Sequence, residues 1–135
     1  MVSFAGTRRI LLLGGGATCA HFARMCDDMG AEVHVATSPR HASESIEGSD
    51  FMGWLSAQGI SCSIHRKLDN DFIREQGVPG TLAVSFGAAW VIKADLIQAL
   101  QGRIVNVHAA PLPLYRRAEG FSWRIMNGDT GEHCV

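Results

Sequence analysis

A short apolar run that ends in three glycines constrains the fold of this 135-residue chain more than any other feature. Residues 10–13 read Ile-Leu-Leu-Leu, which is typical of a strand buried on both faces, and the glycines at 14–16 predict a tight turn. Residues 18–29 carry apolar side chains at spacings of three and four, which predicts a helix, and residues 31–36 alternate as a second strand. A strand, a helix and a strand joined in this way predict a right-handed crossover between parallel strands.

The rest of the chain repeats this alternation of short strands and helices. Strands are predicted over residues 60–64, 81–86 and 103–108, and helices over residues 51–58, 69–76, 93–100 and 119–126. Residues 39–50 are rich in Ser, Glu and Gly and have no clear period, so we expect a mobile loop. Residues 127–131 predict a turn, and residues 132–135 the start of another strand. The pattern predicts one Rossmann-like α/β domain over residues 1–135, with a mostly parallel, twisted sheet and flanking helices.

Composition and charge narrow the class of protein. The chain is 47% hydrophobic and 19% charged, and no apolar run approaches the roughly 20 residues of a membrane helix. The N-terminus has no apolar region long enough for a signal peptide, so we expect a cytoplasmic protein. A net charge of −1 gives no general basic field, which disfavours nucleic acid as a partner but leaves a local patch for tRNA open. The four cysteines and six histidines lack metal-ligand spacing, which indicates reduced thiols and no metal site.

The segment over residues 104–116 combines polar side chains and prolines in a way that is typical of a functional site. Alternation along the predicted strand sends Asn106 and His108 to the same face, and Pro111 and Pro113 then end the strand. Acyl transfer to an amine requires a donor to the developing oxyanion and a group that moves a proton. An amide beside an imidazole supplies both, so Asn106 and His108 are the predicted catalytic residues.

These residues resemble the folate-dependent formyltransferases, a family whose members act on glycinamide ribonucleotide, on methionyl-tRNA or on nucleotide-linked amino sugars. The family carries Asn-x-His followed by Leu-Pro-x-Tyr-Arg-Gly. This chain has Asn106-Val107-His108, then Leu112-Pro113-Leu114-Tyr115-Arg116, with Arg117 where the family usually has Gly. Residues 123–129 resemble the helix and turn that follow in those enzymes. The resemblance is loose from residue 10 onward and close over residues 82–130.

The resemblance implies an N-formyltransferase that uses 10-formyltetrahydrofolate as its formyl-donor cosubstrate. Asn106 would polarise the formyl oxygen and His108 would assist proton transfer, while the acceptor amine attacks the formyl carbon directly. Neither a covalent enzyme intermediate nor a metal is implied. Tyr115 and Arg116 would lie on the substrate-binding loop. The family also uses an aspartate whose segment would lie beyond Val135, so the resemblance implies an incomplete N-terminal domain, truncated at its C-terminal end.

The loop after the fourth predicted strand is the expected folate slot. In the family the matching loop lines the site of the pterin ring, which implies folate contacts from Phe86, Gly87, Ala89, Trp90, Val91 and Ile92. On sequence alone, without the resemblance, Trp90 and Ile92 are better explained as anchors of the hydrophobic core.

The glycine turn is the predicted acceptor site. It joins a strand to a helix N-terminus, where backbone amides and the helix dipole favour an anion. The residues concerned are Gly14, Gly15, Gly16, Ala17 and Thr18. We therefore expect a small phosphorylated or nucleotide-linked amine as the acceptor, although a turn that only packs the helix on the strand explains the glycines as well.

Two other classes of function stay open. The turn nearly matches the dinucleotide fingerprint, but Cys19 replaces its third glycine and no acidic residue follows Ala36, which argues against NAD. Thr37, Ser38 and Arg40 could meet a ribose phosphate, so an NADP-binding domain is one alternative. A non-catalytic ligand-binding module on the same scaffold is the other. The identity of the acceptor and the oligomeric state also stay open, although a sheet cut at one edge favours association between copies.

We expect the 135-residue chain by itself to have little or no formyltransferase activity, because the carboxylate that would orient His108 lies beyond its last residue. Loss of one member of such a catalytic set costs about 10³–10⁴-fold in analogous hydrolases. A version extended through that segment should transfer formyl from 10-formyltetrahydrofolate, and Asn106→Ala or His108→Ala should abolish the transfer. Robust turnover by the 135-residue chain, with either substitution harmless, would contradict this placement of the chemistry.

Overall fold

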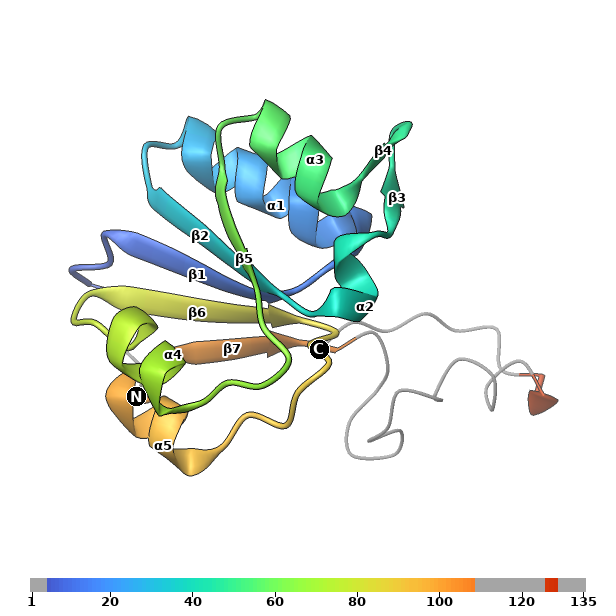
Figure 1. Cartoon of the computed structure of the whole chain (residues 1–135). Helices are drawn as coiled ribbons and strands as arrows, with labels where there is room; N and C mark the ends of the chain where they lie inside the picture. Colours follow the sequence, from blue (N-terminus) through green and yellow to red (C-terminus); the bar gives the residue numbers. More distant parts are fainter. Residues whose placement is uncertain (1–4, 109–125, 129–135) are drawn as a thin grey trace.

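One parallel five-stranded sheet lies at the centre of the fold (Figure 1). This computed structural model describes residues 5–108 and 126–128. The strand order of the sheet is β5-β2-β1-β6-β7, and every neighbouring pair is parallel. The strands are β1 (Arg9–Gly14), β2 (Glu32–Thr37), β5 (Ser61–Ile64), β6 (Thr81–Phe86) and β7 (Ile104–Val107). Each begins within one residue of its predicted start, and the predicted Rossmann-like α/β fold is confirmed.

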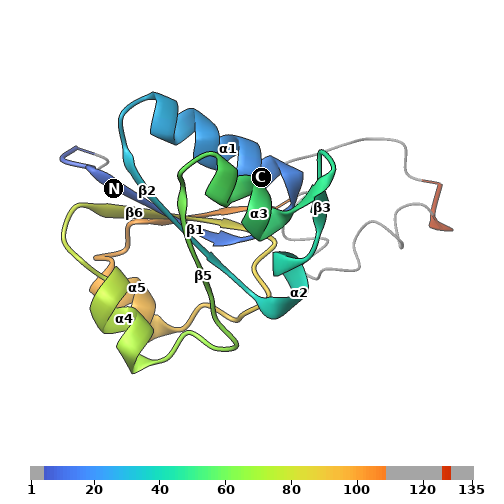
Figure 2. The ribbon, with the colours of Figure 1, turned by 45° about the horizontal axis from the view of Figure 1, so that its top comes forward.

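Helices cover both faces of this sheet (Figures 1 and 2). One face carries α1 (Gly16–Asp28) and α3 (Phe51–Ala57), and the other carries α4 (Asn70–Gln76) and α5 (Ala94–Ala99). All four agree with the predicted helices to within two residues at each end. The side chain of Asp50 begins α3 by accepting the Gly53 N–H at 2.6 Å, as its place before the helix predicts.

The strand β1 supplies both hydrophobic cores. Ile10 and Leu12 pack in the cluster beneath α1 and α3, whereas Leu11 and Leu13 pack in the cluster beneath α4 and α5. Successive side chains of a strand point to opposite faces, so a strand covered on both sides is apolar at every position. This explains the uninterrupted Ile-Leu-Leu-Leu run.

The prediction of a loop over residues 39–50 was wrong, because a short helix and two short strands form there. A short helix, α2 (Pro39–Ala42), is followed by a hairpin of β3 (Ser45–Ile46) and β4 (Ser49–Asp50). Ser38 caps α2 and Pro39 occupies its first turn. A serine followed by a proline is a signal for the start of a helix, but the Ser, Glu and Gly content of the segment as a whole indicated a loop. Glu47 and Gly48 both have positive φ, as the two-residue turn of a tight hairpin requires.

Most of the predicted C-terminal elements lie outside the described residues. This holds for the strand over residues 132–135 and for all but the last residue of the helix over residues 119–126. Asn127 and Gly128 form a turn, as predicted, and Gly128 has a φ of 68°. Within residues 5–108 and 126–128, no helix has the length and apolar character needed to cross a bilayer.

Gly14 lets β1 approach β6 closely at the carboxyl edge of the sheet. It pairs with Phe86, has a φ of 141°, and a Cβ atom at Gly14 would collide with the Phe86 backbone carbonyl. The first glycine of the turn is therefore required by backbone packing, independently of any ligand.

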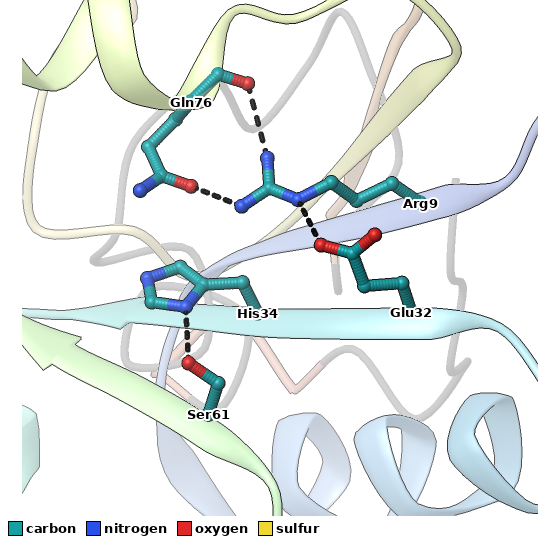
Figure 3. A network of polar contacts seen from close by, with 5 residues as sticks. All are labelled: Arg9, Glu32, His34, Ser61 and Gln76. Atoms are coloured by element: carbon teal, nitrogen blue, oxygen red, sulfur yellow. Dashed lines mark hydrogen bonds and ion pairs between the residues drawn. The ribbon is translucent and has the colours of Figure 1, made fainter.

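A polar network secures the edge strand β5 (Figure 3). His34 of β2 contacts the hydroxyl oxygens of Ser61 and Ser63 at 2.8 and 2.7 Å, one through each ring nitrogen. Nearby, Arg9 donates to the Glu32 carboxylate at 3.1 Å and to the Gln76 side-chain oxygen at 2.5 Å. Burial lowers the pKa of His34 to about 4, with smaller contributions from the positive charges of Arg9 and of a neighbouring histidine.

We expect His34 to make the protein less stable in mild acid. Its folded-state pKa lies below the ordinary value of 6.5, so between pH 6.5 and about 4 the unfolded chain binds more protons and the free energy of unfolding falls as pH falls. Above pH 6.5 this contribution is constant. Urea unfolding across this range should show a shallower pH dependence for His34→Gln than for the wild type. Identical pH profiles would contradict the assignment, because all other titrating groups are common to both proteins.

Gly14→Ala should destabilise the fold more than Gly59→Ala. Gly59 also has positive φ, at 73°, but a Cβ atom there meets open space. Gly59→Ala should therefore cost only backbone strain of about 1 kcal/mol, whereas Gly14→Ala adds the collision with a carbonyl, a further 1–3 kcal/mol or so. Urea unfolding of both variants measures the difference, and equal losses would show that β1 and β6 are not in such close contact.

Candidate active site

The last described strand brings Asn106 and His108 to the carboxyl edge of the sheet. β7 pairs with β6 so that Asn106 lies opposite Ser85, on the face covered by α4 and α5. Asn106 is exposed and His108 is half-buried. Both line one cavity of about 500 Å³, so the structure brings the two predicted catalytic residues together.

The other walls of this cavity, which we call the main cavity, are mostly apolar. They come from the loop after β6, from α5 and from β7 itself. The lining residues besides the catalytic candidates are Ser85, Gly87, Ala88, Trp90, Ile92, Ile97, Ile104 and Val107. Among the described residues that line it, none is Asp, Glu, Lys or Arg, so its polar groups are hydroxyl, amide and imidazole.

The loop after β6 supplies only part of the predicted folate slot. Gly87, Trp90 and Ile92 line the main cavity, and the two larger side chains also pack against the core beneath α5. Trp90 and Ile92 are therefore core anchors that also line a cavity, and their contact with folate stays a prediction. Ala89 is exposed and does not line this cavity.

Phe86 and Val91 lie away from the main cavity. Phe86 points to the opposite face of the sheet, where its ring lies 5.2 Å from that of Phe22, because it directly follows Ser85 in an extended strand. Val91 is 83% exposed and lines a smaller neighbouring cavity instead.

Several residues that line the main cavity were not predicted from the sequence. Ser85 is buried at the end of β6 and faces Asn106 in register, and its signal was a hydroxyl that interrupts an apolar strand. Ile97 and Ile104 carried no such signal, because they read as ordinary apolar residues of a helix and a strand. Only the packing of α5 against β7 places them in the cavity.

A second cavity of about 200 Å³ adjoins the first and shares Trp90 with it. Arg66, Lys67 and Lys93 line it, from the loops that precede α4 and α5, together with Asp95. It is therefore a mainly cationic site beside an uncharged one.

The glycine turn lies at the same edge of the sheet, two strands from β7. Gly15 precedes α1 without a side-chain cap, and the helix has no acidic residue in its first turn. The imidazole of His41 packs against Gly15, and the carboxylate of Glu44 lies near Gly16. The turn is thus packed tightly by α2 and by the residues that follow it.

The residues on which the NADP alternative depends are largely inaccessible. Thr37 and Ser38 are buried, and Ser38 caps α2, which leaves Arg40 as the one exposed member of the three. This arrangement argues against a ribose phosphate at the end of β2. Tyr115 and Arg116, the predicted residues of the substrate loop, lie outside the described residues.

The geometry suits a reaction at a carbonyl carbon. The amide of Asn106 on β7 and the imidazole of His108, just after that strand, line a cavity with mostly apolar walls. In such a cavity a hydrogen bond to a developing oxyanion is stronger than in water. The cavity also has the size of a pocket for a small organic molecule.

Comparisons with known proteins point to one group of enzymes. No family model matches the chain. The chain is 37% identical over 60 residues to the methionyl-tRNA formyltransferase of Solibacter usitatus (strain Ellin6076), a match that covers 44% of this chain and 19% of that protein.

Solved structures share the fold. Glycinamide ribonucleotide transformylase 1 from Symbiobacterium toebii superposes with a TM-score of 0.68 at 15% identity, over 96% of this chain and 65% of that one. A formyltetrahydrofolate deformylase from Pseudomonas putida KT2440 superposes with a TM-score of 0.58 at 15% identity, over 94% of this chain and 46% of that one. The chain therefore spans less than two thirds of the length of these proteins. The chain is thus similar in fold to these two structures and, over 60 residues, similar in sequence to a methionyl-tRNA formyltransferase.

Proposed function

We propose that this chain carries the folate-binding and catalytic part of an N-formyltransferase. The enzyme would transfer a formyl group from 10-formyltetrahydrofolate to an amine of a small phosphorylated or nucleotide-linked acceptor. The observation that carries the proposal is the main cavity, which Asn106 and His108 line together with Trp90 and Ile92. A reactive carbonyl and the ring system that bears it need such a combination of polar and apolar walls.

In the proposed reaction the acceptor nitrogen attacks the formyl carbon. A new carbon–nitrogen bond forms, and the formyl oxygen gains negative charge that the side-chain N–H of Asn106 stabilises. The bond from the formyl carbon to N10 of the folate then breaks, and its electron pair stays on N10. The proton that the acceptor amine loses is taken up by His108 and delivered to N10, so the imidazole ends the cycle unchanged.

The two adjoining cavities suit the two ends of a folate. The flat pterin ring would lie in the main cavity against Trp90, where stacking and burial favour it. Folates also carry a glutamate tail with free carboxylates. Arg66, Lys67 and Lys93 of the second cavity are the cations that would attract this tail.

The acceptor would bind across the carboxyl edge, between the glycine turn and β7. The turn residues Gly14, Gly15, Gly16, Ala17 and Thr18 are the proposed contacts, together with Tyr115 and Arg116. Ligands of open parallel sheets bind at this edge, which supports the assignment. The names of the related proteins point to glycinamide ribonucleotide and methionyl-tRNA as acceptors. Both of these molecules contain phosphate.

A folate analogue without a transferable formyl group should change the fluorescence of Trp90 on binding. The chain has three tryptophans, so Trp90→Phe should remove most of the signal change, whereas Trp54→Phe, on the opposite face of the sheet, should keep it. We expect a saturable titration with folate and none with NADP. Asn106→Ala should bind the analogue within a few-fold of the wild type, because its role lies in the reaction.

Two results would count against this function. Saturable binding of NADP without folate would favour the dinucleotide alternative. A folate signal that survives in Trp90→Phe and disappears in Trp54→Phe would place the ligand on the wrong face of the sheet.

A further inference from the structure

A serine hydroxyl lies beside Asn106 in the main cavity. Ser85 of β6 pairs in register with Asn106 of β7, on neighbouring parallel strands (Figure 1). Such partners project to the same face of a sheet, and both residues line the main cavity. Ser85 is 3% exposed, whereas Asn106 is classed as exposed, so the serine lies deeper in the cavity than the amide.

The fold itself does not use this hydroxyl. On its other side Ser85 pairs with Leu13 of β1, which is apolar and fully buried. Among the described residues, none forms a hydrogen bond with the Ser85 side chain. Removing a hydroxyl from water without a partner costs free energy, and alanine would fill the same position without that cost. The Ser85 hydroxyl is therefore better explained by a ligand than by the fold.

A second hydroxyl on the same strand shows that the lack of a partner alone does not mark a site. Thr81 begins β6 and lies on the same face as Ser85, because the two are separated by an even number of residues. Its hydroxyl is also unpartnered among the described residues, but it is sealed in the interior and lines neither cavity. The feature that distinguishes Ser85 is its place in the main cavity next to Asn106.

The spacing of the two strands suits one acceptor shared by both side chains. Neighbouring strands lie about 4.8 Å apart, and O–H and N–H donors hold an oxygen at about 2.5–3.2 Å. An oxygen atom between the two residues is therefore within reach of the Ser85 hydroxyl and the Asn106 amide together. None of the described residues that line the cavity is a lysine or arginine, so an oxyanion there depends on neutral donors or on the imidazole of His108.

We propose that Ser85 is a further catalytic residue, a second hydrogen-bond donor to the formyl oxygen beside Asn106. The inference rests on the proposed function and adds a residue to its site. When the acceptor nitrogen attacks, negative charge grows on the formyl oxygen and the hydrogen bond from Ser85 strengthens with it. Ser85 keeps its proton and forms no covalent bond. Its role is to stabilise the oxyanion, which a single amide would otherwise do alone.

The test is a binding cycle with two stable folate analogues that differ only in the formyl group. These are 10-formyl-5,8-dideazafolate and 5,8-dideazafolate, titrated into the 135-residue chain by calorimetry. Ser85→Ala should bind the formyl-bearing analogue roughly three- to tenfold more weakly than the wild type does, because one hydrogen bond is lost. It should bind the analogue without formyl as the wild type does. Asn106→Ala should show the same selective loss.

Thr81→Val is the matched control, since it removes a hydroxyl from the same strand and face while keeping the shape of the side chain. It should leave both affinities unchanged. Ser85→Cys keeps a side chain of similar size but is a weaker donor, so it should also lose affinity for the formyl-bearing analogue alone. Selective loss in both Ser85 variants would therefore report the hydrogen bond and not the shape of the cavity.

The results that count against Ser85 are distinct from those that count against the proposed function. If the wild type bound neither analogue, the folate assignment would fail, and the role of Ser85 with it. If the wild type bound both and Ser85→Ala bound both equally well, the role of Ser85 alone would be overturned. An equal loss with both analogues would also overturn it, because Ser85 would then support the cavity or the ring and not the formyl oxygen.

Discussion

The burial of β1 on both faces is the constraint on which the rest of the structure depends. Leu11, Leu12 and Leu13 are fully buried, and they divide between the two hydrophobic clusters of the protein. A strand with this pattern is stable only between two layers of helices. It therefore requires crossover connections, which make every strand of the sheet parallel and bring all their carboxyl ends to one edge.

The candidate site is a consequence of that shared edge. Gly14, Ser85 and Asn106 are far apart in the chain but lie on the neighbouring strands β1, β6 and β7. Strands lie about 4.8 Å apart, so three adjacent ends bring their side chains within the span of one small molecule. The absence of a side chain at Gly14 adds to this, because β1 can then meet β6 directly at the edge.

Charge divides this edge into regions of different character. The main cavity is uncharged, the second cavity is mainly cationic, and the glycine turn is bordered by the carboxylate of Glu44. The two cavities suit different parts of the proposed folate, because an apolar wall favours a ring and cations favour carboxylates. Specificity on such a scaffold comes from loops, since the sheet beneath them serves mainly to hold them in place.

The sequence by itself determined the order along the chain of the five sheet strands and the four longer helices, and the position of Asn106 and His108 at the carboxyl end of β7. These features depend on alternation and on capping residues, which act within a few residues of one another. Only the tertiary structure decided that residues 39–50 fold into α2 and a hairpin against α1, and that Glu44 from this segment borders the glycine turn. It also decided that Ile97 completes the main cavity. Contacts of this kind join segments that are distant in the chain, and no local pattern of polar and apolar residues specifies which of them will meet.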